Sequence, residues 1–532
     1  MTTQQEPSKT ALPGDHAIST GLRAGAIGLT SVLFMAVANA APITAMSFNV
    51  PISIGYGNGL GTPAGFLFAT IVLTFFTIGY VTMARHITTT GAFYGFISHG
   101  LGQVTGMASG LLATVAYVIF EGSLIGGFGY FAHDVVNTSF DLNIHWLYFA
   151  LFGALLIGVM TFYAITLTAA VLSVTLVSEV VLLLALGLSV LVKGGPDGYM
   201  FSDTVPIVPA FSSLDAQAFG TGAAAGVAAI GIFFAFWSWV GYETTAVYGE
   251  ESRNPKHIVP RATLIAVVGL GLFYTFMSWM VIVGQGKTEA VNLSISANPV
   301  DLWLNLVDTN LGGFVQGIYK LLLVVGSFAC AMAFHNAASR YIYAIGREVP
   351  WTGVRSTVGA THRVHQSPAV ASWIQTGITV VLTLLFFFFT SVKTPDANGN
   401  LVDTPALVPY VNLYGLLALI GTAMILIVQT ICSAAVISYF FVRKVHPGNV
   451  LWSLVCPLIG GAGMVYALIL LWDNREFAAG YGAGSKVFTL MPWYVVLTLV
   501  VGLGYALWLR SAHPGKYAEI GRTTLEEAHE RV

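Results

Sequence analysis

The sequence predicts an all-α polytopic membrane protein with twelve transmembrane helices. Of its 532 residues, 56% are hydrophobic and 9% are charged, whereas a soluble domain carries about 25% charged residues. The apolar residues form long runs with few charges, which is typical of membrane helices. The positive charges gather on one side of the predicted bundle, as membrane topology requires.

The apolar runs fall into twelve segments, each of which reaches the ~20 residues needed to span the hydrocarbon core. Backbone groups in lipid must be hydrogen-bonded internally, and the alternating pattern of a membrane barrel is absent, so the segments are predicted helices. Their bounds are 24–56, 63–84, 103–132, 144–167, 169–192, 223–249, 260–285, 315–345, 367–390, 406–441, 450–472 and 491–509.

The Lys and Arg residues indicate the orientation. With the N-terminus placed in the cytoplasm, 16 of the 22 Lys and Arg residues lie on the cytoplasmic side and 6 on the other side. Positive residues concentrate on the cytoplasmic side of membrane proteins. We therefore expect a multi-pass protein of the plasma membrane with both termini in the cytoplasm.

The composition also excludes several classes of function. There is no basic stripe and no zinc or RNA-binding motif, so nucleic acid is not an expected partner. Cys330, Cys432 and Cys456 are scattered through apolar segments, which predicts neither a disulfide framework nor a metal site. The expected partners are the lipid bilayer and a small molecule, with no cofactor. The oligomeric state stays open.

Two segments contain residues that interrupt a membrane helix. In the first, Pro42 lacks an N–H and clashes with the preceding turn, which predicts a kink or an unwound stretch. In the sixth, Gly241 and Glu243 follow the aromatic-rich run 233–239. A break at membrane depth is tolerated where it lines a cavity, and its bare peptide groups can bind a substrate or an ion. A simple packing kink is the alternative interpretation of Pro42.

Three carboxylates lie within the predicted spans, namely Glu121, Glu179 and Glu243. Charged groups inside a membrane are costly, so each is a candidate functional group. The alternative is a neutral glutamic acid that is hydrogen-bonded to a neighbouring helix. His335 and Asn336, near the inner end of the eighth segment, are interpreted as polar groups that pack helices together.

The sixth segment and the residues after it resemble a known signature. Residues 235–243 read AFWSWVGYE, and residues 249–262 read GEESRNPKHIVPRA. This pattern is similar to the sixth-helix signature of the amino acid/polyamine/organocation (APC) permeases. Residues 90–94 and 333–340 resemble the start of that family's third helix and the end of its eighth helix. The resemblance covers about residues 20–510.

The resemblance implies a leucine-transporter-like fold, with a five-plus-five inverted repeat, two accessory helices, and helices one and six unwound at mid-membrane. The implied units are a cytoplasmic tail (1–20), the first repeat (21–192), an extracellular loop (193–222), the second repeat (223–442), the accessory helices (450–510) and a cytoplasmic tail (511–532).

The resemblance also implies a central site between helices one, three, six, eight and ten. The unwound backbone of helix one would bind the substrate carboxylate, and that of helix six would bind the amine. Glu121 on helix three is expected to face the pocket and to suit a distal amine. The expected substrate-binding residues are Ala41, Pro42, Ile43, Thr44, Glu121, Ala235, Phe236, Trp237, Ser238 and Tyr242, and the expected coupling or gating residues are Glu179, Glu243, Trp237 and Ser327.

Two departures from the family pattern concern this site. The usual Gly-Ser-Gly run of helix one is replaced here by Ala40-Ala41-Pro42-Ile43-Thr44. Many relatives carry a lysine in helix five where this chain has Glu179. A carboxylate at that place can carry a proton or help to hold a cation.

The implied function is that of a secondary active transporter, not an enzyme. It would import an amino acid, a small amine or a polyamine by alternating access, coupled to H+, with Na+ coupling or pure exchange as alternatives. A potassium transporter of related fold would need more oxygen ligands and fewer aromatic residues than the sixth segment has. An integral membrane enzyme would need an acidic cluster or a base with a nucleophile at one membrane face, and the adjacent acidic pair after the sixth segment, Glu250 and Glu251, belongs to the family signature.

Overall fold

The computed structural model describes residues 21–163, 165–215, 225–296, 298–395 and 400–522. Most of these residues are helical, which confirms the polytopic all-α class. Ten helices in this part of the chain are long and apolar enough to cross a membrane, and Trp146–Phe162 is a shorter apolar helix. The count of twelve crossings stays a prediction. The predicted tail 1–20, the end of the predicted loop 193–222 and the end of the tail 511–532 lie outside the described residues.

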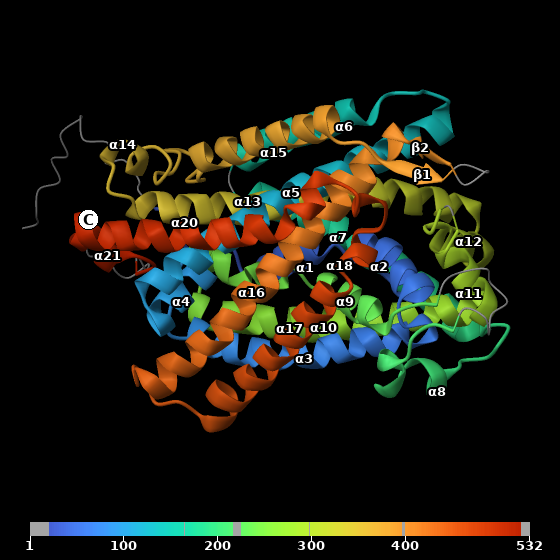
Figure 1. Cartoon of the computed structure of the whole chain (residues 1–532), viewed down its shortest axis with the longest axis horizontal. Coiled ribbons are helices and arrows are strands. Elements are labelled where there is room, and N and C mark those ends of the chain that lie inside the picture. Colours follow the sequence, from blue (N-terminus) through green and yellow to red (C-terminus); the bar gives the residue numbers. More distant parts are fainter. Residues whose placement is uncertain (1–20, 164, 216–224, 297, 396–399, 523–532) are drawn as a thin grey trace, which may run out of the picture.

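Most of the long helices run along the longest axis of the molecule (Figure 1). The first half contains α1 (Leu29–Ala40), α2 (Pro42–Tyr56), α3 (Thr62–Ala84), α4 (Phe93–Leu101), α5 (Gln103–Phe140), α6 (Trp146–Phe162), α7 (Ile165–Lys193), α8 (Phe201–Thr204), α9 (Ala228–Trp237), a 3-10 helix (Tyr242–Glu251) and α10 (Pro255–Gln285).

The second half contains α11 (Lys287–Ser294), α12 (Asp301–Leu311), α13 (Gly313–Glu348), α14 (Thr352–Arg355), α15 (Ala369–Phe389), α16 (Leu417–Ile437) with wider turns before and after it (Val408–Leu416 and Ser438–Val442), α17 (Cys456–Asp473), α18 (Arg475–Ala479), α19 (Lys486–Thr489), α20 (Met491–Ala512) and α21 (Pro514–Glu519). The strands β1 (Lys393–Pro395) and β2 (Leu401–Asp403) form an antiparallel hairpin.

Several short elements lie at the two ends of the bundle. α8, α11, α12 and the β1–β2 hairpin lie at one end in Figure 1, and α14 and α21 lie at the opposite end. This division agrees with the predicted topology, in which the former belong to extracellular loops and the latter to cytoplasmic ones. Exposed side chains along α20, such as Trp493, Leu497 and Val500, are apolar and suit contact with lipid.

The first predicted segment is divided between α1 and α2. Ala41 separates them with φ 43° and ψ 71°, a left-handed conformation that residues other than glycine rarely adopt. Pro42 is the first residue of α2, where a missing N–H costs nothing because that position has no intrahelical acceptor. The proline therefore starts a new helix, and the second proline, Pro51, lies inside α2.

The sixth predicted segment is also divided. α9 ends at Trp237, a turn follows, and the 3-10 helix begins at Tyr242. Gly241 has φ 108°, and a Cβ added there would lie 2.5 Å from the Asn39 Cβ. Glycine therefore permits both the turn and the close approach of α1.

Close contact between helices depends on small residues, as in α17 against α3. A Cβ added at Gly460 would lie 2.5 Å from the backbone N of Phe76. We expect Gly460→Ala to destabilise the protein by about 1–3 kcal/mol, the usual cost of overpacking a filled interior. The measurement is the thermal unfolding midpoint of the purified protein in detergent.

Gly504→Ala is the matched control, because Gly504 lies on the exposed face of α20 with nothing within 4 Å of the added atom. Its midpoint should equal or slightly exceed that of the wild type, since alanine favours a helix more than glycine does. Equal losses in the two variants would contradict the packing described.

Candidate functional site

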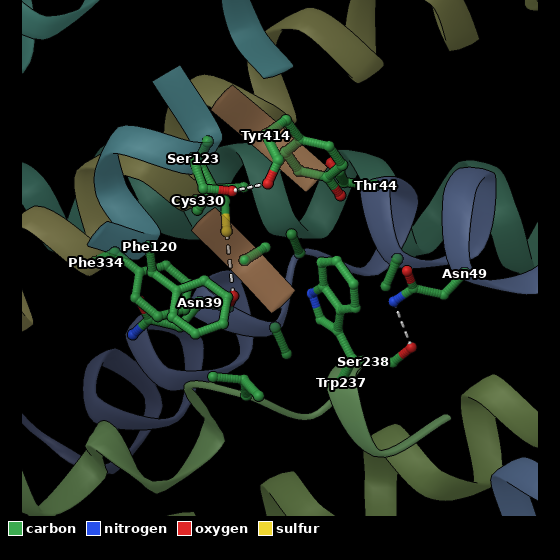
Figure 2. Close-up of a pocket in the computed structure, with 16 residues that line it drawn as sticks. Asn39, Thr44, Asn49, Phe120, Ser123, Trp237, Ser238, Cys330, Phe334 and Tyr414 are labelled. Carbon is green, nitrogen blue, oxygen red and sulfur yellow. Dashed lines mark hydrogen bonds between the residues drawn. The ribbon is translucent and has the colours of Figure 1, made fainter. Parts of the chain in front are cut away.

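A small cavity lies at the interruption between α1 and α2 (Figure 2). Its volume is about 30 Å³, enough for a water molecule or two. The lining comes from the first, third, sixth, eighth and tenth predicted segments, the five that the resemblance implied. The lining residues are Asn39, Ala40, Ala41, Thr44, Ala45, Asn49, Phe120, Ser123, Leu124, Trp237, Ser238, Val240, Cys330, Phe334, Tyr414 and Ala418.

The lining is neutral and partly aromatic. None of the residues that line this cavity in the described chain carries a charged side chain. Phe120 and Phe334 stack with their ring centroids 4.9 Å apart and their planes 14° apart. The Thr44 hydroxyl is buried and has no hydrogen-bond partner within the described part of the chain. A buried hydroxyl without a partner is energetically costly, so a bound molecule that supplied one would be stabilised.

Hydrogen bonds connect the first and sixth segments on both sides of the interruption. The Asn39 side-chain amide donates to the Thr244 hydroxyl at 2.8 Å. The Asn49 side-chain amide donates to the Ser238 hydroxyl, also at 2.8 Å (Figure 2). The cavity therefore lies between two cross-links that hold the interrupted segments together.

The last carbonyls of α1 find partners outside the helix. The Cys330 thiol donates to the carbonyl of Asn39 at 3.1 Å, and the Tyr274 hydroxyl donates to that of Ala40 at 3.0 Å. Terminal carbonyls have no intrahelical donor, and lipid offers none. Side chains of α13 and α10 thus donate hydrogen bonds to the carbonyls at the end of α1, where the helix is interrupted.

Glu179 of α7 satisfies the beginning of α2. Its Oε2 accepts a hydrogen bond from the backbone N–H of Ile43 at 3.3 Å, and its side chain is 3% exposed. A Cβ at Gly326 would lie 2.5 Å from the Glu179 Oε1, so the glycine of α13 leaves room for the carboxyl group. No salt bridge involves Glu179 among the described residues. Ser327, another of the expected coupling or gating residues, is hydrogen-bonded within α13, where its hydroxyl donates to the Val324 carbonyl at 2.9 Å.

Glu243 and Tyr242 lie outside the cavity lining. The Glu243 carboxylate accepts hydrogen bonds from the Tyr117 hydroxyl at 2.7 Å and from the Gly241 N–H at 3.0 Å. The Tyr242 hydroxyl is hydrogen-bonded to Thr77 of α3 at 2.7 Å. Both side chains thus contribute to packing between the 3-10 helix, α3 and α5, and the expectation that Tyr242 encloses the substrate does not match its position.

Glu121 also lies outside the lining. Its Oε1 is 3.0 Å from the His335 Nδ1, and its Oε2 accepts a hydrogen bond from the Gln375 amide. The His335 Nε2 is 2.8 Å from the Ser372 hydroxyl. Glu121 therefore joins α5 to α13 and α15 and does not line the small cavity. Its expected contact with a distal amine of the substrate stays a prediction.

Of the expected substrate-binding residues, the cavity includes Ala41, Thr44, Trp237 and Ser238 and excludes Pro42, Ile43, Glu121, Ala235, Phe236 and Tyr242. The residues that sequence reasoning missed include Asn39, Asn49, Phe120, Ser123, Cys330, Phe334 and Tyr414. The two asparagines flank the Pro42 interruption in sequence, which was a usable signal. Nothing in the sequence distinguishes Tyr414 from the other aromatic residues.

A larger cavity of about 530 Å³ adjoins the small one. The two share Asn49, Trp237 and Tyr414, so these residues separate them. The Trp237 ring stacks on Phe234 at 5.0 Å. The remaining lining residues of the larger cavity are Phe48, Ile52, Tyr56, Phe234, Tyr410, Val411, Gly415, Phe477, Ala478, Ala479, Gly480 and Tyr481.

Two ion pairs involve the last two residues of the 3-10 helix, Glu250 and Glu251. Glu251 receives hydrogen bonds of 2.7 and 2.9 Å from the Arg340 guanidinium. Glu250 receives bonds of 3.1 and 2.9 Å from Arg347 and one of 3.1 Å from the Thr90 N–H. Burial by itself would raise the pKa of the Glu250 carboxyl, but Arg347 and the Thr90 donor hold that pKa below its usual value.

A sequence model described as "Amino acid permease" matches residues 27–502. The chain belongs to the amino acid permease family. This membership confirms the resemblance to the APC permeases and places the chain with transporters, not with membrane enzymes.

Two curated relatives also match this permease. It is 24% identical over 327 residues to the branched-chain amino acid permease BcaP of Bacillus subtilis (strain 168), a match that covers 59% of this chain and 65% of the relative. It is 26% identical over 158 residues to amino-acid permease 2 of Neurospora crassa, which covers 28% of this chain and 27% of that protein. Each match spans less than two thirds of the relative's length.

The buried pair of Glu250 and Arg347 gives a stability prediction. Arg347→Gln should destabilise the permease by about 3–5 kcal/mol, because it leaves a carboxylate buried without its cation. The double variant Glu250→Gln/Arg347→Gln should recover much of this loss. The measurement is the thermal unfolding midpoint at neutral pH.

The pH dependence follows from the depressed pKa of Glu250. The pair contributes stability above the ordinary glutamate pKa of about 4.3, and that contribution is lost as the pH falls through the lower folded-state value. The double variant should lack this acid-dependent loss. Lys287→Gln, at the exposed pair with Asp203, is the control and should change the midpoint little. A similar loss in Lys287→Gln and Arg347→Gln would contradict the assignment.

Proposed function

We propose that this permease is a secondary active transporter that imports a neutral amino acid by alternating access. The observation that carries this proposal is the cavity at the interruption of the first segment, with its unpartnered Thr44 hydroxyl and no charged side chain. The carboxylate of an amino acid would bind near Ala41 and Thr44 at the start of α2, and the amine near the end of α9. Helix ends supply the bare peptide groups that such charges need.

The lining favours an aliphatic side chain in the substrate. Phe120 and Phe334 offer an apolar wall, and the carboxylate that follows Phe120 in the chain, Glu121, is engaged with His335. A cationic side chain would be buried there without a counter-ion, which is costly. The relative in Bacillus subtilis is named a branched-chain amino acid permease, which supports the same substrate class over a polyamine or a basic amino acid.

The proposed architecture follows the family pattern. We infer twelve crossings, with repeats over 21–192 and 223–442 and accessory helices over 450–510. The two interruptions would lie at mid-membrane depth, the β1–β2 hairpin outside, and both termini in the cytoplasm. Each of the twelve apolar segments contains a helix, and the lining contributed by five of them supports this arrangement.

The cavities and ion pairs support a conformation that is closed on the inner side. The larger cavity would be the outer vestibule, and Trp237 with Tyr414 would separate it from the substrate site. The pairs of Glu250 and Glu251 with their arginines would close the inner side. Outward rotation of Trp237 would enlarge the site, since an amino acid needs more room than the small cavity provides.

Glu179 is the proposed coupling group, and the coupling ion is a proton. A carboxylate buried without a cation is costly, whereas its protonated form is neutral. It is hydrogen-bonded to Ile43, in the first turn after the interruption, so a change in its protonation would act directly on the substrate site. Sodium coupling and pure exchange remain the alternatives. A potassium transporter is disfavoured by the aromatic lining, and inhibition of uptake by potassium would reveal it.

The substrate proposal predicts uptake of leucine, isoleucine or valine by proteoliposomes that contain the purified permease. Thr44→Val should weaken substrate binding by roughly twofold to tenfold, since one hydrogen bond contributes about 0.5–1.5 kcal/mol. Thr498→Val, on the exposed face of α20, is the control. Uptake of arginine or putrescine in preference to leucine would refute the neutral substrate class.

The coupling proposal predicts a selective defect in Glu179→Gln. This variant should lose uptake driven by an inward proton gradient and retain exchange of internal for external substrate, because exchange needs no net proton movement. Glu476→Gln, at an exposed residue of α18, is the control. Proton-driven uptake that persists in Glu179→Gln, or uptake that requires sodium, would exclude this role.

A further inference from the structure

The chain beyond α20 turns back onto the molecule. Most side chains from Ser511 to Gly515 are exposed, but Ile520 is 0% exposed and belongs to the main apolar cluster. α21 lies at the same end of the bundle as α4 and α14 (Figure 1). Burial of a large apolar side chain at the end of such a segment favours docking of the segment on the surface that the side chain enters.

Gly521 is fixed both by its shape and by a hydrogen bond. It has φ +65°, and a Cβ added there would lie 2.2 Å from the Ser98 hydroxyl of α4. Its N–H donates to the Glu348 Oε2 at 2.9 Å, and the Tyr94 hydroxyl donates to the same oxygen. Only glycine fits this position, because any other residue would be strained and would clash.

This docking site adjoins the ion pair that closes the same end of the bundle. Glu348, at the end of α13, directly follows Arg347, the partner of Glu250. Glu250 in turn accepts a hydrogen bond from the Thr90 N–H. Thr90 lies four residues before Tyr94, whose hydroxyl donates to Glu348. The residue that Gly521 contacts, Glu348, is therefore the chain neighbour of Arg347.

We propose that residues 520–521 form an intramolecular latch that stabilises the inner-closed state and slows transport. The inference rests on the proposed function. While docked, the Gly521 N–H and the Tyr94 hydroxyl hold the Glu348 carboxylate. When the segment leaves, Glu348 loses one donor and competes with Glu250 for Arg347, which weakens the inner ion pair. Contacts made in only one state shift the population towards that state.

The test uses the full chain with Gly521→Ala, and Ile520→Asp as a second way of releasing the segment. Gly515→Ala is the matched control, because it adds the same atom six residues earlier where nothing lies within 4 Å. Hydrogen–deuterium exchange is measured over residues 513–522 and at the Thr90 amide, which reports on Glu250. The initial rate of amino acid exchange is measured in proteoliposomes.

Both release variants should accelerate exchange over 513–522 and at Thr90 several-fold, and should raise the initial transport rate, whereas Gly515→Ala should resemble the wild type. A segment that is released with no change at Thr90 overturns the latch, and so does a segment that neither variant releases. A transport rate that falls although the segment is released and the protein stays folded also overturns it. If the wild type moved no amino acid, the proposed function would fail, while the Thr90 amide would still decide whether the latch holds the ion pair.

Discussion

Everything at the centre of this permease depends on how the chain satisfies its backbone where α1 stops. A helix end in a membrane leaves carbonyls and N–H groups that lipid cannot bond. Here the thiol of Cys330 and the hydroxyl of Tyr274 each donate a hydrogen bond to a carbonyl at the end of α1. The carboxyl of Glu179 accepts one from an N–H at the start of α2. The break is thus stabilised by α13, α10 and α7, and its position is fixed by three helices that lie far from it in sequence.

The Thr44 hydroxyl is an exception to this pattern of hydrogen bonding. Thr44 lies in the first turn of α2, close to the groups that Glu179 and its neighbours satisfy, yet its own hydroxyl has no partner within the described residues. The Asn39 Oδ1, which also belongs to the cavity lining, is likewise without a partner among the described residues. Buried polar atoms of this kind beside a cavity are candidates for hydrogen bonds to a ligand.

The two sides of the cavity are closed by different chemistry. The rings of Trp237 and Tyr414 lie between the two cavities, and they can rotate without breaking an ion pair. At the end of the 3-10 helix, Glu251 and Glu250 are each joined by two hydrogen bonds to Arg340 and Arg347, and Arg347 is the one partly exposed member. Separation of such pairs is costly unless water reaches both partners. In the proposed alternating-access mechanism, opening at the ion pairs would therefore require water to reach them, whereas opening at the aromatic residues would require only a local motion.

The sequence predicted the class of fold and the helical segments well, because long apolar runs and few charges admit few other solutions. It predicted both interruptions, at Pro42 and near Gly241, from residues that disfavour a continuous helix. The site was predicted less well for a geometric reason. Successive helix residues point about 100° apart, so in α5 the side chains of Phe120, Ser123 and Leu124 share one face, whereas Glu121 points to another. The charged residue of α5 therefore lies on a different face of the helix from the residues that line the cavity. The partner that holds it there, His335, was known from the sequence only as a polar residue, and their pairing depends on the packing of α5 against α13, which spacing along the chain does not encode.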